Sequence, residues 1–547
     1  MSSAMGHFAF WEPTPDNYPN HLAATEAERL RWPSSRWVLV GLLLACLVPR
    51  AWMAMRIPSV CPDGVLYVRL AQAIDHGDFQ AVFRDDMRLN VYPFILAAMH
   101  RLGFDWQTGG ALWGVLISSL VALPLWGWIR RQFDHRVALA ACLLYAVHPK
   151  AVEWSPELMR DPTFWFFFTL SLYVLWRAAT ELRNVWFLAA GAAITLATMT
   201  RVEGLFLLVP FVLWTFWRCL ALPTGRGRLL GGALACVVIF PLLLAVADIA
   251  WTSSHAGSTM IRVAPLSRAQ EWLESLWDGQ SDEIAGHLTL GRMIWVFIPT
   301  MTRGLSPIFA LLMFGGIWGW RRVWIRRDHQ TLFYVALLVL GGIWIQLWID
   351  RMICPRYAMP IVLMASPWAA LGLLALLERT ARFVRRFDAR RIPQVVAVTT
   401  LLAAIVAANL TIGLTSNRSY FKTRRAEVEV GRWLDQNLPK PLHIVGPVGV
   451  ASVIGFYADC EDSFTTYRRD AAESTIVALI RSEKADVVIL RPSKQQTPRQ
   501  CLALANRMKR QGWSPLGPDV LPEAQDEFYL LVRPNLLKNA RQPTPHP

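Results

Sequence analysis

Charged residues are scarce in this chain of 547 residues, and acidic ones are scarcer than basic ones. Only 17% of the residues are charged, with 40 Asp and Glu against 55 Lys and Arg, whereas 54% are hydrophobic. The apolar residues also come in long blocks, which is typical of chains that cross a membrane many times. The composition therefore excludes an ordinary soluble protein and predicts a polytopic α-helical membrane protein.

Several motifs are also missing. No Cys-x-x-Cys pair occurs among the eight cysteines, and no cluster has metal-ligand spacing, so we predict no metal site and no cofactor. A need for a divalent cation stays open, and a Cys460–Cys501 disulfide is one pairing that spacing alone does not establish. The net charge of +15 could suggest nucleic acid, but no nucleic-acid motif supports this. The basic residues instead cluster in short loops between apolar blocks.

Eleven apolar blocks are predicted to cross the bilayer as helices of about 17–22 residues. The third block is short and could be tilted or re-entrant, and residues 293–302 are too short to cross and should lie in the interface. No small-residue cleavage site follows the first block, so we expect it to be retained as the first span. The blocks lie near 37–55, 111–129, 136–149, 162–178, 184–200, 204–222, 229–250, 304–320, 331–349, 357–377 and 394–414.

Arginine placement predicts the orientation of these spans. Arginines gather before residue 37 and near 130–136, 218–228, 321–327 and 382–391, in alternate loops. Because basic loops stay in the cytoplasm, the N-terminal segment 1–36 should be cytoplasmic. The membrane domain would then be 37–416, with outer loops 56–110 and 251–303, in the plasma (inner) membrane.

Residues 417–547 are more polar and should form a separate domain outside the membrane. Helix-like runs such as "ESTIVALIRSEK" alternate there with strand-like runs such as "ADVVIL" and "FYLLVR". This alternation predicts a small α/β domain, and the last residues read as a disordered tail. With an odd number of spans, this C-terminal domain should be extracytoplasmic.

Ionisable residues near the membrane gather at the predicted outer face, and we find none at mid-depth. Such residues are costly to bury, so their placement indicates function. A transporter would be expected to keep acids or broken helices near the midplane, whereas an outer layer favours an enzyme. Arginines in this layer suit a lipid phosphate, although any one of them could simply reach for headgroups. The layer comprises His148, Lys150, Arg201, Glu203, Asp248, Arg303, Asp350, Arg351 and Arg356.

The stretch "CPDGVLYVRLAQAIDHGDF", residues 61–79, follows the first span. Its apolar residues recur at helical spacing, so we predict an amphipathic helix that lies against the membrane and does not cross it. Asp63 would sit at or beside the N-cap of this helix. A cap is a common use of Asp, and it is compatible with a catalytic carboxylate.

The order of these features resembles the C-type glycosyltransferases, especially family 39, which includes polyprenyl-phosphate-mannose protein mannosyltransferases and aminoarabinose transferases of lipid A. The resemblance covers roughly residues 37–420. It rests on the loop acid Asp63, then Tyr67 and Ala71, and then Tyr92-Pro93. Further matches are "LMRDPTFWFFFTLSLYVLW", "MTRVEGLFLLVP" and "RYAMPIVLMA".

The resemblance implies an inverting transfer of one sugar from a polyprenyl-phosphate donor to a glycan, lipid or protein acceptor. Asp63 would be the general base, and arginines would hold the lipid phosphate. The substrate-binding candidates are Tyr67, Arg88, Tyr92, Arg160, Asp161, Arg201, Glu203, Arg351, Arg356 and Tyr357.

Departures from the family pattern keep alternatives open. Asp63 has no adjacent acid, Arg201 stands where relatives often have lysine, and Phe94 replaces a second proline. Asp161 could be only a helix N-cap, Arg201 and Glu203 a structural ion pair, and Arg356-Tyr357 an interface anchor. The base could instead be one of four other loop acids, namely Asp75, Asp78, Asp85 or Asp86. Other function classes are a transporter or flippase of lipid-linked sugars and a non-catalytic scaffold.

Overall fold

The computed structural model describes the chain in thirteen stretches, separated by gaps. They are residues 35–78, 90–221, 226–236, 239, 290–319, 327–350, 353–387, 391–415, 418–460, 463–467, 471–492, 497–516 and 528–537. Most of the predicted outer loop 251–303, part of the loop 56–110, the segment 1–34 and the tail 538–547 lie outside these residues.

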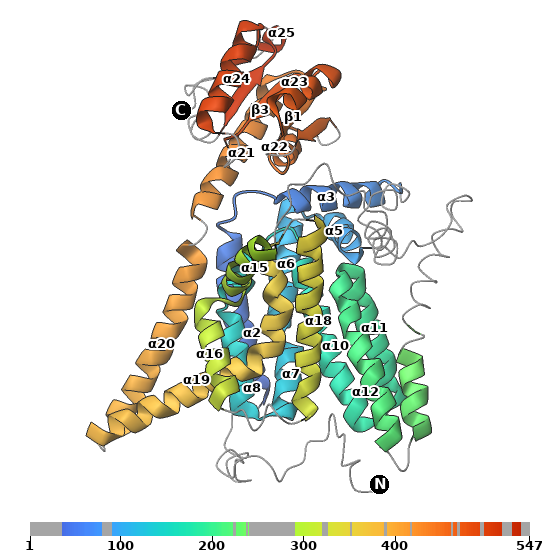
Figure 1. Ribbon diagram of the computed structural model, residues 1–547, viewed down its shortest axis with the longest axis vertical. Coiled ribbons are helices and arrows are strands. Elements are labelled where there is room, and N and C mark those ends of the chain that lie inside the picture. Colours follow the sequence, from blue (N-terminus) through green and yellow to red (C-terminus); the bar gives the residue numbers. More distant parts are fainter. Residues whose placement is uncertain are drawn as a thin grey trace.

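A bundle of apolar helices forms the body of the molecule (Figure 1). Each of the eleven predicted blocks falls on a helix where it is described, and block 229–250 is described through residue 236 and at 239. Block 111–129 falls on two helices, α6 and α7, and the described start of block 229–250 is helical over 229–236. The named helices are α2 (Ser35–Ala54), α6 (Trp106–Leu120), α7 (Ala122–Gln132), α8 (His135–Ala146), α10 (Asp161–Glu181), α11 (Asn184–Thr200), α12 (Leu208–Ala221), α16 (Pro307–Gly319), α18 (Arg327–Asp350), α19 (Met359–Phe387) and α20 (Arg391–Thr415).

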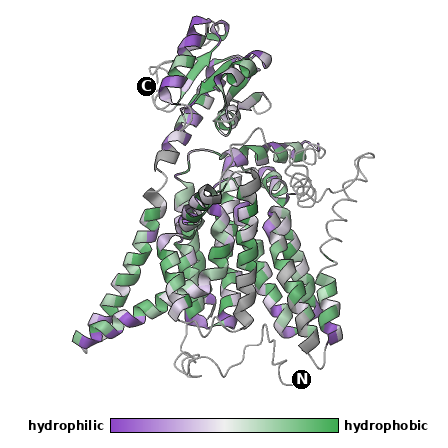
Figure 2. Cartoon of the chain, in the orientation of Figure 1, coloured by the Kyte–Doolittle hydropathy of each residue, from purple (hydrophilic) through white to green (hydrophobic). Residues whose placement is uncertain are grey.

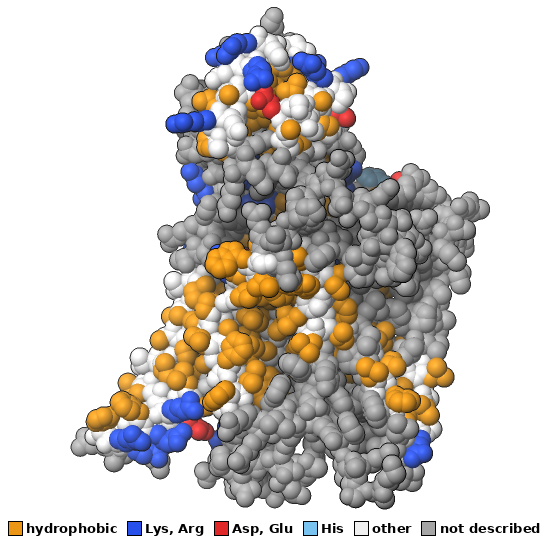
Figure 3. All heavy atoms as spheres, viewed as in Figure 1, with side chains coloured by type: hydrophobic (Ala, Val, Ile, Leu, Met, Phe, Trp, Pro, Cys, Tyr) orange, Lys and Arg blue, Asp and Glu red, His pale blue; other side chains and the backbone are white. Residues whose placement is uncertain are grey.

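The helices of the bundle are rich in hydrophobic residues (Figure 2). Apolar side chains predominate on the described part of the face in view (Figure 3). Among the described residues, four helices are long and apolar enough to cross a membrane, or up to five if a bent pair counts as one span. The chain is therefore a multi-pass membrane protein, whereas the count of eleven spans stays a prediction. The four are Arg36–Ala54, Trp106–Gln132, Pro355–Phe387 and Pro393–Gly413.

Small residues let two of these helices pack with their backbones in contact. A Cβ atom on Gly316 of α16 would lie 1.9 Å from the Trp368 carbonyl oxygen of α19. A Cβ atom on Gly372 of α19 would lie 1.9 Å from the Leu312 carbonyl oxygen of α16. Since only glycine fits both positions, the pair fixes how α16 and α19 cross, as small residues do in membrane bundles.

The first span contains a charge that the sequence interpretation passed over. Arg50 lies four residues before the end of α2 and is fully buried. Its Nη1 donates to the carbonyl oxygens of Cys46 at 2.8 Å and Ala146 at 3.1 Å, and its guanidinium lies 4.7 Å from the centre of the Tyr145 ring. These contacts compensate the buried charge and tie α2 to the end of α8.

A layer of short helices covers one end of the bundle (Figure 1). The helix predicted within residues 61–79 is present as α3, and α15 contains the short apolar stretch 293–302 and meets α16 at 88°. Their place in the interface stays a prediction. This layer brings segments that are far apart in sequence over the same helix ends. Its elements are α3 (Pro62–Asp75), α5 (Val91–Arg101), α9 (Pro149–Trp154), η2 (Val202–Leu207), α15 (Leu290–Leu305) and η3 (Pro355–Ala358).

Beyond the layer, residues 418–537 form an α/β unit with a five-stranded sheet in the order β2-β1-β3-β5-β4. Strand β1 is parallel to β2 and β3, and β5 is antiparallel to β3 and β4. Cys460 and Cys501 are buried free thiols, so the disulfide option was wrong. The elements are α21 (Arg418–Asn437), β1 (Ile444–Pro447), α22 (Ala451–Tyr457), β2 (Phe464–Tyr467), α23 (Glu473–Ser482), β3 (Val487–Leu490), α24 (Pro498–Arg510), β4 (Ser514–Pro515), β5 (Tyr529–Val532) and α25 (Pro534–Leu537).

The α/β unit rests on the layer through α22. Val453 of α22 is buried in the same apolar cluster as the residues of α3. The Tyr457 hydroxyl accepts a hydrogen bond from the Val60 amide at 2.9 Å and donates one to Gln107 Oε1 at 2.7 Å. Hence the C-terminal unit contacts the loop that leads into α3.

Candidate active site

The start of α3 is held in place by Cys61, and Asp63 is not the cap. The Cys61 sulfur accepts a hydrogen bond from the Gly64 amide at 3.3 Å, and its thiol donates to the Leu158 carbonyl at 3.3 Å. A Cβ atom on Gly64 would lie 2.8 Å from the Leu158 side chain, so α3 is pressed against the loop before α10. Asp63 is the second residue of α3, where the helix dipole favours a negative charge, and its side chain is 40% exposed.

Asp63 is paired with an arginine from almost three hundred residues away. The Arg356 Nη2 atom of η3 donates to Asp63 Oδ2 at 2.5 Å, while the Arg356 side chain is only 12% exposed. Its Nη1 lies 2.7 Å from the Met159 sulfur. Its Nε lies 4.0 Å from Asp161 Oδ1 and has no hydrogen-bond partner in the described part of the chain. The Asp63–Arg356 contact is therefore a charge-assisted hydrogen bond between a partly exposed carboxylate and a mostly buried guanidinium.

A second arginine is enclosed between two acids. Arg201 ends α11 and donates to Asp161 Oδ1 at 2.8 Å and to Glu203 Oε1 at 2.5 Å. All three side chains are at most 10% exposed. The Arg201–Glu203 ion pair is thus present, with Asp161 as a further member. Asp161 is the first residue of α10 and the N-cap is Arg160, so the interpretation of Asp161 as the N-cap was wrong.

These pairs join into one chain of alternating charges: Asp63, Arg356, Asp161, Arg201 and Glu203. Three carboxylates face two guanidinium groups, and Arg201 is in direct contact with two of these carboxylates. A buried ion pair of this kind fixes geometry more than it adds stability. Little of the positive charge on Arg201 remains for an incoming anion.

Arg160, next in sequence to Asp161, differs from Arg201 and Arg356 in its contacts. Among the described residues it has no hydrogen-bond or ion-pair partner, and it is half-buried. Its charge reaches Tyr67 of α3: burial raises the pKa of Tyr67 to about 12, and Arg160 opposes this shift. Arg160 is therefore a cation beside the site that is still available to a ligand.

Aromatic rings line the same place. The Tyr67 and Tyr92 rings meet edge to face at 5.2 Å, and the fully buried Tyr92 hydroxyl has no hydrogen-bond partner among the described residues. The Tyr357 ring lies between two guanidinium groups, 4.7 Å from Arg201 and 5.5 Å from Arg356. Such contacts hold cationic side chains in position over an apolar floor.

Glu157 is a member of this region that the sequence interpretation missed. It lies in the loop between α9 and α10, is 3% exposed, and its Oε2 atom has no hydrogen-bond partner among the described residues. Burial raises its pKa to about 7, and the Arg424 charge opposes this shift. The sequence feature that could have identified Glu157 is its position in "SPELMRDP", a short segment that also contains Arg160 and Asp161.

The other proposed bases fall elsewhere. Asp75 pairs with Arg101 at 2.8 Å at the far end of α3, roughly 18 Å along the helix from Asp63 at 1.5 Å per residue. Asp78 is exposed beyond that end. Asp85, Asp86, Arg88 and Arg351 lie outside the described residues.

Comparison with known proteins now adds to this geometry. Residues 90–244 match the family model of dolichyl-phosphate-mannose-protein mannosyltransferases. The undecaprenyl phosphate-α-4-amino-4-deoxy-L-arabinose arabinosyl transferase of Pseudomonas aeruginosa is 28% identical over 361 residues. That match covers 62% of this chain and 59% of the relative, so the chain spans about three-fifths of the length of the curated relatives it matches.

Solved structures share the fold. The ArnT protein of Cupriavidus metallidurans, bound to undecaprenyl phosphate, matches with a TM-score of 0.54 and 14% identity, over 91% of this chain and 98% of that one. The oligosaccharyltransferase of Archaeoglobus fulgidus matches with a TM-score of 0.53 and 12% identity, over 84% and 70%. The fold is that of the C-type glycosyltransferases. The chain is thus similar to the family 39 glycosyltransferases in fold and, over residues 90–244, in sequence.

Proposed function

We propose that this protein transfers one sugar, with inversion, from a polyprenyl-phosphate donor to an acceptor at the outer face of the membrane. The observation that carries the proposal is the placement of Asp63. It is a partly exposed carboxylate at the start of an interfacial helix, next to Arg356 and above the ends of the bundle. The family likeness supports the same chemistry.

The reaction needs one base and one cationic site. An acceptor hydroxyl would lose its proton to the Asp63 carboxylate while its oxygen attacks the anomeric carbon. The bond from that carbon to the phosphate oxygen would break, and the polyprenyl phosphate would leave with the electron pair. Guanidinium groups would stabilise the charge that develops on the phosphate.

We assign the phosphate to Arg160 and Arg356, and not to Arg201. Arg160 makes no hydrogen bond or ion pair among the described residues and acts on Asp161 and Glu203 only through its charge, whereas Arg201 is in direct contact with both carboxylates. A phosphate that draws Arg356 toward itself would also release Asp63 from its ion pair and leave it more basic. Donor binding would thereby prepare the base. Tyr67, Tyr92 and Tyr357 would line the donor site, while Asp161, Arg201 and Glu203 would support it.

The remaining assignments follow from the sequence and belong to the same proposal. The protein would lie in the plasma membrane with segment 1–36 in the cytoplasm and residues 417–547 outside. The acceptor would be a glycan, lipid or protein. We propose no cofactor, and the need for a divalent cation stays open. Alkaline phosphatase fused after residue 537 should be active if the C-terminal domain is extracytoplasmic.

Asp63→Asn tests the assignment of the base. Transfer of labelled sugar from a polyprenyl-phosphate donor to envelope acceptors should fall about 100- to 10,000-fold, as expected when a general base is lost. Binding of undecaprenyl phosphate to the purified variant should persist. Asp75→Asn is the matched control, because it removes an acid from the other end of the same helix and should leave transfer unchanged.

Two results would contradict the proposal. Full transfer by Asp63→Asn would exclude Asp63 as the base. Movement of the lipid-linked sugar across proteoliposome membranes without transfer would instead support the transporter class.

A further inference from the structure

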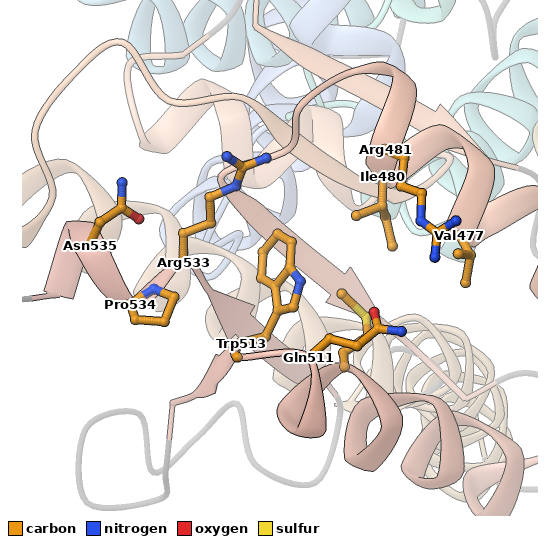
Figure 4. Close-up of a pocket in the computed structure, with 10 residues that line it drawn as sticks. Val477, Ile480, Arg481, Gln511, Trp513, Arg533, Pro534 and Asn535 are labelled. Carbon is orange, nitrogen blue, oxygen red and sulfur yellow. The ribbon is translucent and has the colours of Figure 1, made fainter.

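The C-terminal domain contains a pocket of about 410 Å³ (Figure 4). It opens where α23 and α24 end and where the chain leaves β5. Ile480 and Met508 supply an apolar floor, and Trp513, Arg481 and Arg533 stand around it. The volume is within the range of about 300–1,000 Å³ that is usual for small-molecule sites.

Arg533 is held rigidly at this pocket. Its Nε donates to the Ala485 carbonyl oxygen at 2.6 Å, and its guanidinium lies 5.8 Å from the centre of the Trp513 ring. Only Nε is used in hydrogen bonding among the described residues, so both terminal nitrogens remain available. In Figure 4 the guanidinium of Arg533 lies beside the indole ring, with Arg481 on the far side of the pocket.

Neither arginine has an acidic partner among the described residues. Other basic side chains of the same domain do have acidic partners, such as Arg507 with Glu473 at 2.8 Å and Lys440 with Asp435 at 2.6 Å. Two unpaired guanidinium groups around one hollow therefore create a local positive field. A field of this kind attracts anions and gives them bidentate hydrogen bonds.

The remaining lining groups indicate what else the ligand carries. The half-buried indole of Trp513 offers a flat apolar face of the kind on which a sugar ring can lie. The amides of Gln511 and Asn535 can each donate and accept hydrogen bonds, as hydroxyl groups require. A flat ring face, several hydroxyls and one negative charge together describe an acidic sugar.

We propose that this pocket binds a saccharide that carries a carboxylate or a phosphate. The site is separate from Asp63. It lies where β3 begins and β5 ends, since Val487 pairs with Val532. The opposite end of the parallel strands faces α3, where Gly449 approaches Pro62. The proposal therefore does not depend on sugar transfer and can be tested by binding alone.

The experiment is a titration of the purified full-length protein in detergent, followed by saturation-transfer NMR and calorimetry. The probes are glucuronic acid, glucose 1-phosphate, glucose and inorganic phosphate. Both acidic sugars should bind at least about 10-fold more tightly than glucose or phosphate alone. Only they can contact both the arginines and the indole ring of Trp513. Binding should weaken as salt is raised.

Variants locate the site. Arg481→Gln and Trp513→Ala should each weaken the acidic sugars about 10-fold, and Trp513→Phe should retain most of the binding because it keeps a flat ring. Arg499→Gln is the matched control, since this exposed arginine is on α24 and does not line the pocket. Unchanged affinity in the first two variants would overturn the proposal. So would phosphate alone binding as tightly as the acidic sugars, or glucose binding as tightly as glucuronic acid.

Discussion

Two arginine clusters on this chain differ in how their charge is used. At the membrane face, Arg356 and Arg201 are enclosed by Asp63, Asp161 and Glu203. At the pocket of the C-terminal domain, Arg481 and Arg533 face no acid among the described residues. A buried guanidinium must be compensated by the protein itself, whereas one at an open pocket can wait for a ligand.

The difference teaches that an arginine near a site is not by itself an anion-binding group. Arg201 satisfies two carboxylates and so positions the elements that meet beneath Asp63. Arg160, one residue from Asp161, has no such partner and resembles the arginines of the pocket. All of these arginines are positively charged. What distinguishes a structural arginine from one that can bind a ligand is whether it already contacts an acidic residue.

The largest effect should come from breaking the membrane-face cluster. Arg201→Met would leave Glu203 buried without its ion-pair partner and Asp161 with only the 4.0 Å contact to Arg356, at a cost of about 3–5 kcal/mol. The thermal midpoint of the detergent-solubilised protein should fall steeply. Arg481→Met at the pocket is the matched control and should stay within about 0.5 kcal/mol. Equal midpoints for the two variants would show that the clusters do not differ as described.

The second effect concerns pH and Glu157. Burial raises the pKa of Glu157 from 4.5 to about 7, so the folded state holds its proton more tightly than the unfolded state does. Its contribution to stability is fully present below pH 4.5 and is lost as the pH rises through 7. The loss is at most about 3 kcal/mol at 1.36 kcal/mol per pKa unit.

Glu157→Gln should remove this pH dependence. The thermal midpoints of variant and wild type should be alike near pH 4.5, and the variant should be the more stable at pH 8. A midpoint difference that is the same at both pH values would mean that Glu157 does not titrate between them.

The third effect separates the free arginine from the enclosed one. Arg160→Gln should weaken undecaprenyl phosphate binding about 10- to 100-fold, since hydrogen bonds to charged groups contribute about 1.5–3 kcal/mol. The thermal midpoint should change little because no protein acid loses a hydrogen bond or an ion pair. Arg183→Gln, an exposed arginine at the start of α11, is the control. Retained affinity in Arg160→Gln would remove Arg160 from the phosphate site.

Local sequence patterns predicted the helices well, but they did not predict which distant residues contact each other. The apolar blocks and the period of residues 61–75 predicted helices because both are properties of short windows. The pairing of Asp63 with Arg356 joins residues 293 positions apart, and no window contains both. Cys61 replaced Asp63 as the cap because its sulfur is held by Leu158, which is also distant in sequence. Nothing in the sequence near Glu157 indicates that its side chain is buried, so it was not predicted as a site residue.

The smallest effect tests whether the two regions communicate. Tyr457→Phe would remove the hydroxyl that accepts from the Val60 amide and donates to Gln107, two hydrogen bonds worth about 0.5–1.5 kcal/mol each. The loop before Asp63 would then be held less firmly, and the transfer rate should fall a few-fold while donor affinity is kept. Tyr529→Phe, on β5, is the matched control, because the Tyr529 hydroxyl makes no hydrogen bond to a described residue. If both variants transfer sugar at the wild-type rate, the C-terminal domain does not position Asp63, and its pocket acts independently of the membrane face.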